Sequence, residues 1–189
     1  MTALVLDNTP ISHFARAGQL AVLETLTAGF RRIVPAEVLR ELADGVSLHP
    51  ALAQSLTQPW LEPVELVEID EVVAFAGYKA ELGGGIDRNN GEAAVLAWAK
   101  VHGGTTLIDE RAATRIAKRD DIDVHGTMWL IVNGFKAGHL SRVAASRMVD
   151  LLAATDMALP TDGEGCSPGP TKRGFFPDLH LRPYPPLST

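Results

Sequence analysis

Apolar residues along the chain fall in short runs that alternate with longer amphipathic stretches. Each short run is typical of a buried strand, and each longer stretch repeats its apolar residues at helical spacing. Strands that alternate with helices in this way favour a parallel sheet flanked by helices. Strands are expected at residues 3–6, 32–34, 64–67, 105–108 and 122–124. The sequence therefore predicts an α/β fold, without an internal repeat.

Local signals mark several of the expected helices. Thr9 followed by Pro10 predicts a helix start, with a hydroxyl cap before a proline at the first helical position. Three glycines at residues 83–85 predict a flexible loop. Trp98 and Trp129 lie among apolar neighbours and are expected in the core. Helices are expected at residues 10–17, 20–26, 35–42, 51–57, 69–82, 90–99, 112–118, 127–136 and 141–154.

The last part of the chain differs in composition from the rest. Seven of the twelve prolines lie at or beyond residue 160, with few aliphatic residues among them. Such a segment buries too little apolar surface to offset the entropy lost on ordering it. We therefore expect one domain over residues 1–155 and a proline- and glycine-rich tail over residues 156–189.

Charge is unevenly distributed along the chain, although the net charge is only −6. Residues 1–110 hold fifteen acids and seven basic residues, whereas residues 111–147 hold seven basic residues and three acids. An acidic pocket beside a basic face suits the cleavage of a phosphodiester, but solvated helix faces of either sign explain the same counts. The net charge argues against a protein that holds nucleic acid through bulk positive potential.

Cysteine content and hydropathy indicate the compartment. Cys166 is the only cysteine, so an intramolecular disulfide and a cysteine-based zinc site are both excluded. The N-terminus lacks the basic segment of a signal peptide, and no window approaches about 18 consecutive apolar residues. We therefore expect a cytoplasmic protein without a membrane span.

Two acids are placed by the strands that precede them. Asp7 follows the apolar run that ends at Leu6, and Asp109 follows the run that ends at Ile108. Ligands of open α/β sheets bind beyond the carboxyl ends of the strands. The two carboxylates therefore converge if their strands are neighbours. Taken alone, Asp7 could equally be a first-turn acid favoured by the helix dipole.

Two further acids are placed by helices. Glu41 lies about a turn and a half into the helix that Pro35 opens, and Glu92 begins the helical run GEAAVLAWA. Taken alone, Glu41 could be an ordinary exposed residue and Glu92 a first-turn acid. Together with the two aspartates they make an oxygen-only ligand set, which suits Mg²⁺ or Mn²⁺. Such ions activate water for displacement at phosphorus.

The chain resembles the PIN-domain family, and within it the prokaryotic branch of VapC-type toxins. Four segments carry the resemblance, in the family's order: VLDNTPISHFARAG, VPAEVLREL, GEAAVLAWA, and TLIDERAATRIAKR followed by VHGTMWLI. The last segment is the most specific, and together they cover roughly residues 3–140. The resemblance implies a three-layer α/β/α sandwich around a parallel sheet. It also implies cleavage of single-stranded RNA with Mg²⁺ or Mn²⁺.

The resemblance assigns the family's four acids to Asp7, Glu41, Glu92 and Asp109. It implies that the first, third and fourth ligate the ion, and that the second ligates it or orients the attacking water. Glu37 is the nearest alternative to the second acid, and Thr9 takes the position that supports the metal shell. The first motif departs from the family, since it reads Asp-Asn-Thr where many such toxins read Asp-Thr-Asn. The further acid common beyond the fourth is matched only by the adjacent Glu110.

Basic residues follow the fourth acid on one expected helix. Arg111, Arg115 and Lys118 share a face at i, i+4 and i+7 spacing, from which they could hold the RNA backbone. Arg111 is nearest to the acids and is the best candidate for holding a phosphate. A solvated helix face explains Lys118 and Arg119 about as well.

Two functions other than a nuclease fit part of this pattern. A haloacid-dehalogenase-type phosphotransferase also has an aspartate after its first strand, but it needs a second acid two residues later, where this chain has Thr9. The stronger alternative is a PIN-like domain that binds RNA or a partner protein without cutting. We expect the ribonuclease, as the toxin of a toxin–antitoxin pair. The resemblance also implies a homodimer and a small antitoxin protein that occludes the groove.

Overall fold

Five parallel strands form the central sheet of the computed structural model, which describes residues 1–85 and 88–157. Among these residues the strands lie in the order β3-β2-β1-β4-β5, and every neighbouring pair is parallel. Their bounds are β1 (Ala3–Leu6), β2 (Arg31–Pro35), β3 (Glu62–Val64), β4 (Thr105–Leu107) and β5 (Asp123–His125). The expected parallel sheet is therefore confirmed.

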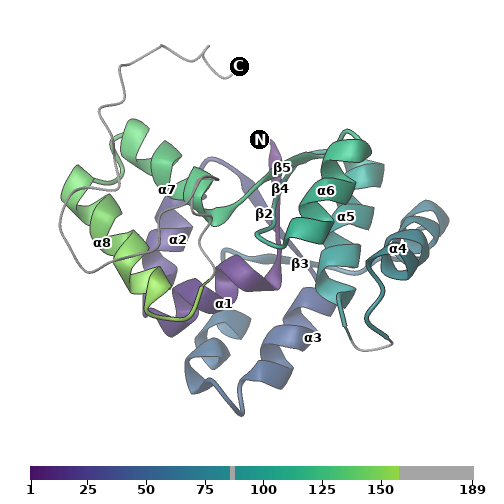
Figure 1. Ribbon diagram of the computed structural model, residues 1–189, viewed down its shortest axis with the longest axis horizontal. Coiled ribbons are helices and arrows are strands. Elements are labelled where there is room, and N and C mark those ends of the chain that lie inside the picture. The colour runs from purple at the N-terminus through teal and green to yellow at the C-terminus, as the bar shows by residue number, and fades with distance from the viewer. Residues whose placement is uncertain (86–87, 158–189) are drawn as a thin grey trace, which may run out of the picture.

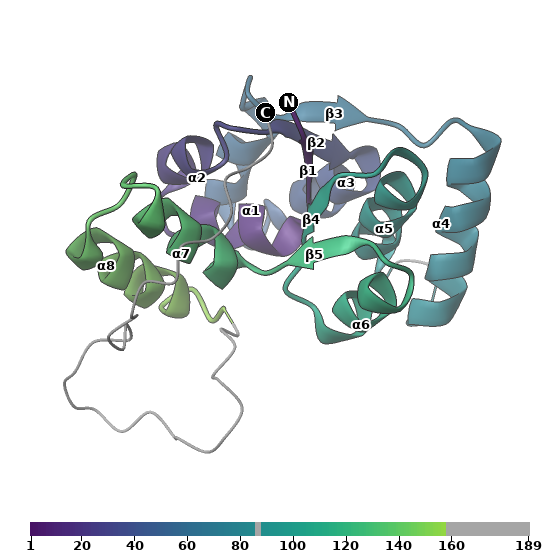
Figure 2. The same ribbon diagram turned by 90° about the horizontal axis from the view of Figure 1, so that it is seen from above.

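Helices cover both faces of this sheet, which lies between the two layers in Figure 2. One layer contains α1 (Asn8–Arg16), α2 (Leu20–Leu26), α7 (Thr127–Lys136) and α8 (Arg142–Ala153). The other contains α5 (Asn90–His102), α6 (Arg111–Arg119) and, outside α5, α4 (Ile69–Leu82). Helix α3 (Ala36–Gly45) lies between α1 and α5 and packs on both (Figure 1), and the 3₁₀ helix η1 (Pro50–Thr57) packs against α1 and α3. The fold is the α/β/α sandwich that the resemblance implied.

The core forms where the strands meet helices on both faces. Leu4, Val5 and Leu6 of the central strand β1 have no exposed surface. Parallel sheets covered on both faces contain nearly continuous apolar strands, which is why the short apolar runs predicted them. Residues 93–99 of α5 are all buried, because this helix lies between the sheet and α4. Its apolar residues consequently surround the helix instead of keeping to one side.

The start of α1 differs from the prediction. The helix begins at Asn8, and its cap is Asp7 instead of Thr9. The Asp7 carboxylate accepts the backbone N–H of Thr9 at 3.5 Å. A carboxylate caps a helix as well as a hydroxyl does. Thr9 and Pro10, which were expected at the helix start, therefore lie within the first turn of the helix.

The outer strands are also displaced from their predicted positions. Strand β3 ends at Val64 instead of spanning residues 64–67. The N–H of Val67 donates to Glu71 at 2.8 Å, and this bond forms the start of α4 instead of extending the sheet. Strand β5 spans residues 123–125, one residue later than expected.

The predicted tail lies almost wholly outside the described residues. Of residues 156–189, only Asp156 and Met157 are described, and Met157 is buried against the core. The predicted glycine loop is described at residues 83–85, while residues 86–87 lie outside the described part. The boundary at residue 155 stays a prediction. In the described part of the chain, no helix is both long enough and apolar enough to cross a membrane.

Candidate active site

The carboxyl ends of β1 and β4 lie side by side. Leu6 is in register with Leu107, and the N–H of Asp7 donates to the Leu107 carbonyl at 3.2 Å. The strands that precede Asp7 and Asp109 are therefore neighbours. This was the condition under which the two carboxylates were expected to converge. This edge of the sheet is where ligands bind in open α/β folds.

Asp7 is a buried carboxylate with one oxygen left without a partner. The residue has no exposed surface, and its Oδ1 makes no hydrogen bond within the described residues. Burial, followed by the nearby carboxylates of Glu92 and Glu41, raises the pKa of Asp7 well above its ordinary value. An unpaired oxygen in such a place is costly, and a cation would satisfy it.

Glu41 reaches from α3 to the first turn of α5. Its Oε1 accepts the backbone N–H of Gly91 at 2.8 Å, and its Oε2 accepts the side-chain N–H of Asn8 at 3.4 Å. A Cβ on Gly91 would lie 2.7 Å from Glu41 Oε2 and 3.3 Å from Asp7 Oδ1. Glycine at this position therefore allows the helix to approach both carboxylates.

Glu92 follows Gly91 in the sequence and is the third acid of a group with Asp7 and Glu41. Burial raises the pKa of Glu92, and the carboxylates of Glu41 and Glu110 raise it further. The carboxylate of Glu92 also raises the pKa of Asp7. The structure thus brings together Asp7, Glu41 and Glu92, which lie far apart in the sequence.

Asp109 is held differently from the other three. Its Oδ1 accepts the backbone N–H of Thr127 at 2.8 Å, and its Oδ2 accepts the Thr127 hydroxyl at 2.7 Å. Burial raises the pKa of Asp109, and the two bonds from Thr127 lower it. A Cβ on Gly126 would lie 2.8 Å from Oδ1, so glycine allows the chain to pass close to this carboxylate. Within residues 1–85 and 88–157, no three His, Cys, Asp or Glu side chains are arranged so that they could hold a metal ion.

Two contact residues were missed or misjudged from the sequence. The sequence placed Thr127 only at the start of an expected helix, but Gly126 is the cap of α7 and Thr127 is the residue that orients Asp109. The Gly-Thr pair after the last strand was the available signal. Asn8, which the first motif placed at an unusual position, contacts Glu41 through its side chain. Thr9 instead contacts Asp7 through its backbone N–H.

A groove of about 780 Å³ opens beside Asp109. Its walls are helix α6 and the carboxyl ends of β4 and β5. Arg111, Arg115 and Lys118 all line it, as their shared helix face predicted. The groove therefore joins an acidic edge to a basic wall.

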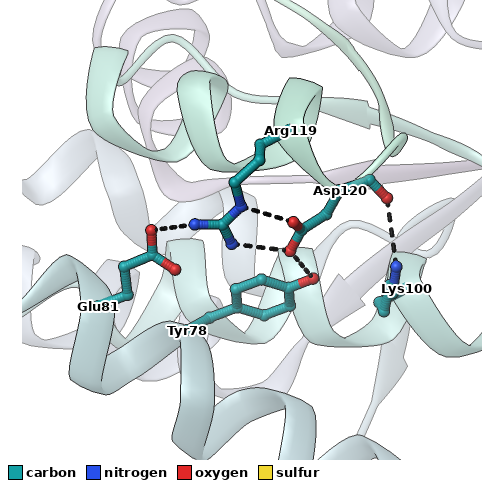
Figure 3. Close-up of polar contacts among 5 residues, drawn as sticks. All are labelled: Tyr78, Glu81, Lys100, Arg119 and Asp120. Atoms are coloured by element: carbon teal, nitrogen blue, oxygen red, sulfur yellow. Dashed lines mark hydrogen bonds and ion pairs between the residues drawn. The ribbon is translucent and has the colours of Figure 1, made fainter.

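Arg119 lies outside this groove and has a structural role (Figure 3). Its guanidinium pairs with Glu81 of α4 and with Asp120, whose carboxylate also accepts the Tyr78 hydroxyl at 2.9 Å. Arg119, together with Tyr78, lowers the pKa of Asp120 to about 2. Lys100 of α5 donates to the Asp120 carbonyl at 3.2 Å. These contacts join α4 and α5 to the end of α6.

Comparison with known families finds a match. A family model, DUF3368: PIN domain, matches residues 3–162, which is most of the chain. The comparison with curated proteins finds no match. PIN domains are in general nucleases, and they typically use divalent metal ions. The extent of the match and the parallel α/β/α sandwich agree, and the chain belongs to the PIN-domain family.

Proposed function

We propose that this PIN-domain protein is a cytoplasmic, metal-dependent endoribonuclease that cleaves single-stranded RNA. The observation that carries the proposal is the buried Asp7 carboxylate. Its Oδ1 has no partner within the described residues, and burial, followed by the carboxylates of Glu92 and Glu41, raises its pKa. Carboxylates in one pocket repel one another. A divalent cation among them relieves the repulsion and supplies the missing contact.

The donor set fits Mg²⁺ or Mn²⁺. Carboxylate oxygens are the ligands that these hard ions take, and they need only one or two from the protein besides water and phosphate. Asp7, Glu92 and Asp109 are the ligands that we propose for one ion or two. Within the described residues they do not form a three-residue cluster, so each ion would take one or two of them and complete its shell with water and phosphate. When bound, the ion supplies an activated water and neutralises charge at the phosphoryl oxygens.

The chain's own residues supply orientation. Glu41 is held by the N–H of Gly91 on one oxygen and by the side-chain N–H of Asn8 on the other, and from this position it would orient a water molecule. Thr127 holds the Asp109 carboxylate at a fixed angle. The backbone N–H of Thr9 supports the Asp7 carboxylate. Arg111, exposed at the groove next to the acids, would hold a phosphate of the RNA.

A catalytically inactive PIN-like module that binds RNA or protein is the second candidate. Its support is Asp109, both of whose oxygens are taken by Thr127. The described acids also lack the geometry of a metal centre. In that case the carboxylates would serve the helix starts that they already cap and contact.

We also propose that the protein is a VapC-like toxin, which acts as a homodimer and is inhibited by a small antitoxin protein. The resemblance of the four segments supports this, and the groove beside Asp109 is the surface that such an inhibitor would have to cover. Expression of the protein alone should arrest growth, and expression of an Asp7→Asn/Asp109→Asn variant should not. Unchanged growth at equal expression would contradict the toxin role only. A monomer in analytical ultracentrifugation would contradict the homodimer.

Cleavage of a mixed single-stranded RNA pool tests the nuclease. Purified protein is incubated with Mn²⁺, with Mg²⁺ and with EDTA, beside the Asp7→Asn/Asp109→Asn variant. The matched control is Asp150→Asn, which changes an exposed acid on α8. We expect metal-dependent cutting by the wild type and the control, and at least a roughly 100-fold loss in the double variant.

The opposite result has a defined meaning. If the wild type and the double variant are equally inert with every ion, the nuclease proposal fails. Calorimetry that then shows binding of RNA or of a protein would support the inactive module.

A further inference from the structure

The groove beside Asp109 has a wall of cations that are available for a ligand. Arg111, Arg115 and Lys118 are exposed, and within the described residues none of them forms an ion pair with an acid. Arg119, the next residue on the helix, is by contrast engaged by Glu81 and Asp120. At 1.5 Å per residue, the three available cations extend over about 10 Å of the helix axis. They form a track for an extended polyanion.

The opposite wall carries an aromatic ring whose plane is fixed. His125, at the end of β5, stacks on Trp129 with ring centroids 4.1 Å apart and an interplanar angle of 8°. Its Nε2 lies 3.2 Å from an Asp123 carboxylate oxygen. Trp129 was expected in the core, as Trp98 is, but it is half-buried and supports this ring from one side.

Part of the His125 side chain stays exposed at the groove. One face is covered by Trp129 and one edge is held by Asp123, yet the side chain keeps 32% of its surface exposed and lines the groove. A ring held in this way can stack on another flat ring with little loss of side-chain entropy. Aromatic platforms beside a cationic track are how proteins hold unpaired nucleic acid strands.

We infer that this groove binds single-stranded RNA beside the acids, with one base stacked on His125 and the backbone phosphates on Arg111, Arg115 and Lys118. The inference rests on the proposed ribonuclease function and names the path of its substrate. A base within a duplex has both faces covered by its neighbours, so it cannot stack on His125 without being unstacked. The groove therefore favours unpaired RNA.

Binding without cleavage tests the inference. Fluorescence anisotropy in EDTA measures the Kd of a labelled single-stranded RNA, an abasic ribose-phosphate strand of equal length, and the same RNA as a duplex. The wild type should bind the single strand most tightly. His125→Ala should weaken its binding by about tenfold, the range that stacking contributes per base, and leave the abasic strand unchanged. His125→Phe should restore most of the affinity, because the flat ring is kept.

The cations give a second, separable signature. Arg115→Ala/Lys118→Ala should weaken binding of the single strand and the abasic strand alike. It should also lower the slope of log K against log salt by about 0.7 for each phosphate that the variant no longer neutralises. Arg147→Ala, which removes an exposed arginine on α8 away from the groove, should change neither quantity.

Failure of this inference is distinguishable from failure of the nuclease proposal. If the wild type cleaves RNA but the His125 and Arg115/Lys118 variants bind it as the wild type does, the groove is wrong and the nuclease stands. If His125→Ala weakens the abasic strand equally, stacking is excluded. If the predicted binding pattern is found but no metal supports cleavage, the groove stands and the nuclease fails. A wild type that binds none of the three strands overturns the inference.

Discussion

Asp7 and Asp109 are acids at the ends of neighbouring strands, but their surroundings act on their charges in different ways. Thr127 donates two hydrogen bonds to Asp109, and both lower a pKa that burial raises. At Asp7, burial acts together with Glu92 and Glu41, and one oxygen has no partner within the described residues. Asp109 is therefore oriented by the protein itself, whereas Asp7 is where the cost of burying charge is concentrated.

Thr127→Val tests what the Thr127 hydroxyl contributes to stability and to the orientation of Asp109. The valine keeps the volume and the backbone bond but removes the hydroxyl that lies 2.7 Å from Asp109 Oδ2. We expect a loss of about 1–3 kcal/mol in the free energy of unfolding, because a hydrogen bond to a charged group is removed. RNA cleavage should fall by roughly tenfold as Asp109 loses its orientation. Urea denaturation measures the loss of stability, and cleavage rates measure the loss of activity. Thr127→Ser is the control, because it keeps the hydroxyl and the backbone N–H that donate to Asp109. A valine variant with the wild-type urea midpoint and rate would contradict the role assigned to Thr127.

Asp7→Asn should stabilise the metal-free protein at neutral pH. The folded protein holds the proton of Asp7 more tightly than the unfolded chain does, because its pKa is raised above the ordinary value of 3.8. The stability that this gives is fully present below pH 3.8 and is lost as the pH rises through the raised folded pKa. An amide carries no charge and caps a helix equally well. We expect a gain of about 0.5–2 kcal/mol at pH 7 in EDTA, together with loss of cleavage. Urea midpoints across the pH range measure the gain, and a variant less stable than the wild type at pH 7 would contradict it.

Helix α5 begins beside Glu41 and Asp7, and this explains features of its first turn. The first N–H groups of a helix have no partner within the helix. Here Glu41, from a different helix, accepts the N–H of Gly91 at 2.8 Å. The same interaction brings a negative charge to the positive end of the helix dipole. The start of α5 and the position of Glu41 therefore depend on each other.

Gly91→Ala should damage the site more than the fold. Its Cβ would meet Glu41 Oε2 at 2.7 Å, so the carboxylate must move from its present position beside Asp7. The helix propensity gained from alanine, about 1 kcal/mol, offsets much of the hydrogen bond that is broken. We expect cleavage to fall by about 10- to 100-fold, with the free energy of unfolding changed by less than about 1 kcal/mol. The matched control is Gly77→Ala on α4, where nothing lies within 4 Å of the new Cβ. That control should keep full activity, and a Gly91→Ala protein that cuts at the wild-type rate would exclude Glu41 from the mechanism.

At the scale of the whole molecule, the sequence predicted what depends on short segments. Apolar runs located the central strands β1, β2 and β4, and the acids that follow β1 and β4 could be placed at strand ends. Contacts between distant segments could not be predicted in the same way. Glu41 and Gly91 are 50 residues apart, and they meet only because α3 packs against α5. The contact of Thr127 with Asp109 needs the pairing of Leu107 with His125 across β4 and β5. The stacking of Trp129 on His125, likewise, is a tertiary contact that no local apolar pattern describes.

A divalent cation should stabilise the whole molecule if it binds where the acids gather. Binding to the folded state alone adds about 2.7 kcal/mol at a ligand concentration of 100 times Kd. For a chain of this length, that corresponds to a rise in Tm of roughly 5–10 °C. We expect Mn²⁺ to raise the Tm of the wild type and of Asp150→Asn, and EDTA to reverse the rise.

Asp7→Asn/Asp109→Asn should start from its own Tm and show no change with Mn²⁺. The wild-type rise should grow with pH, because protons compete with the cation for Asp7, Glu92 and Asp109, whose pKa values are all raised. An equal rise in Tm in the double variant would show that the cation binds elsewhere. If the Tm of the wild type does not rise at Mn²⁺ concentrations that support cleavage, the metal acts in cleavage without binding at these acids.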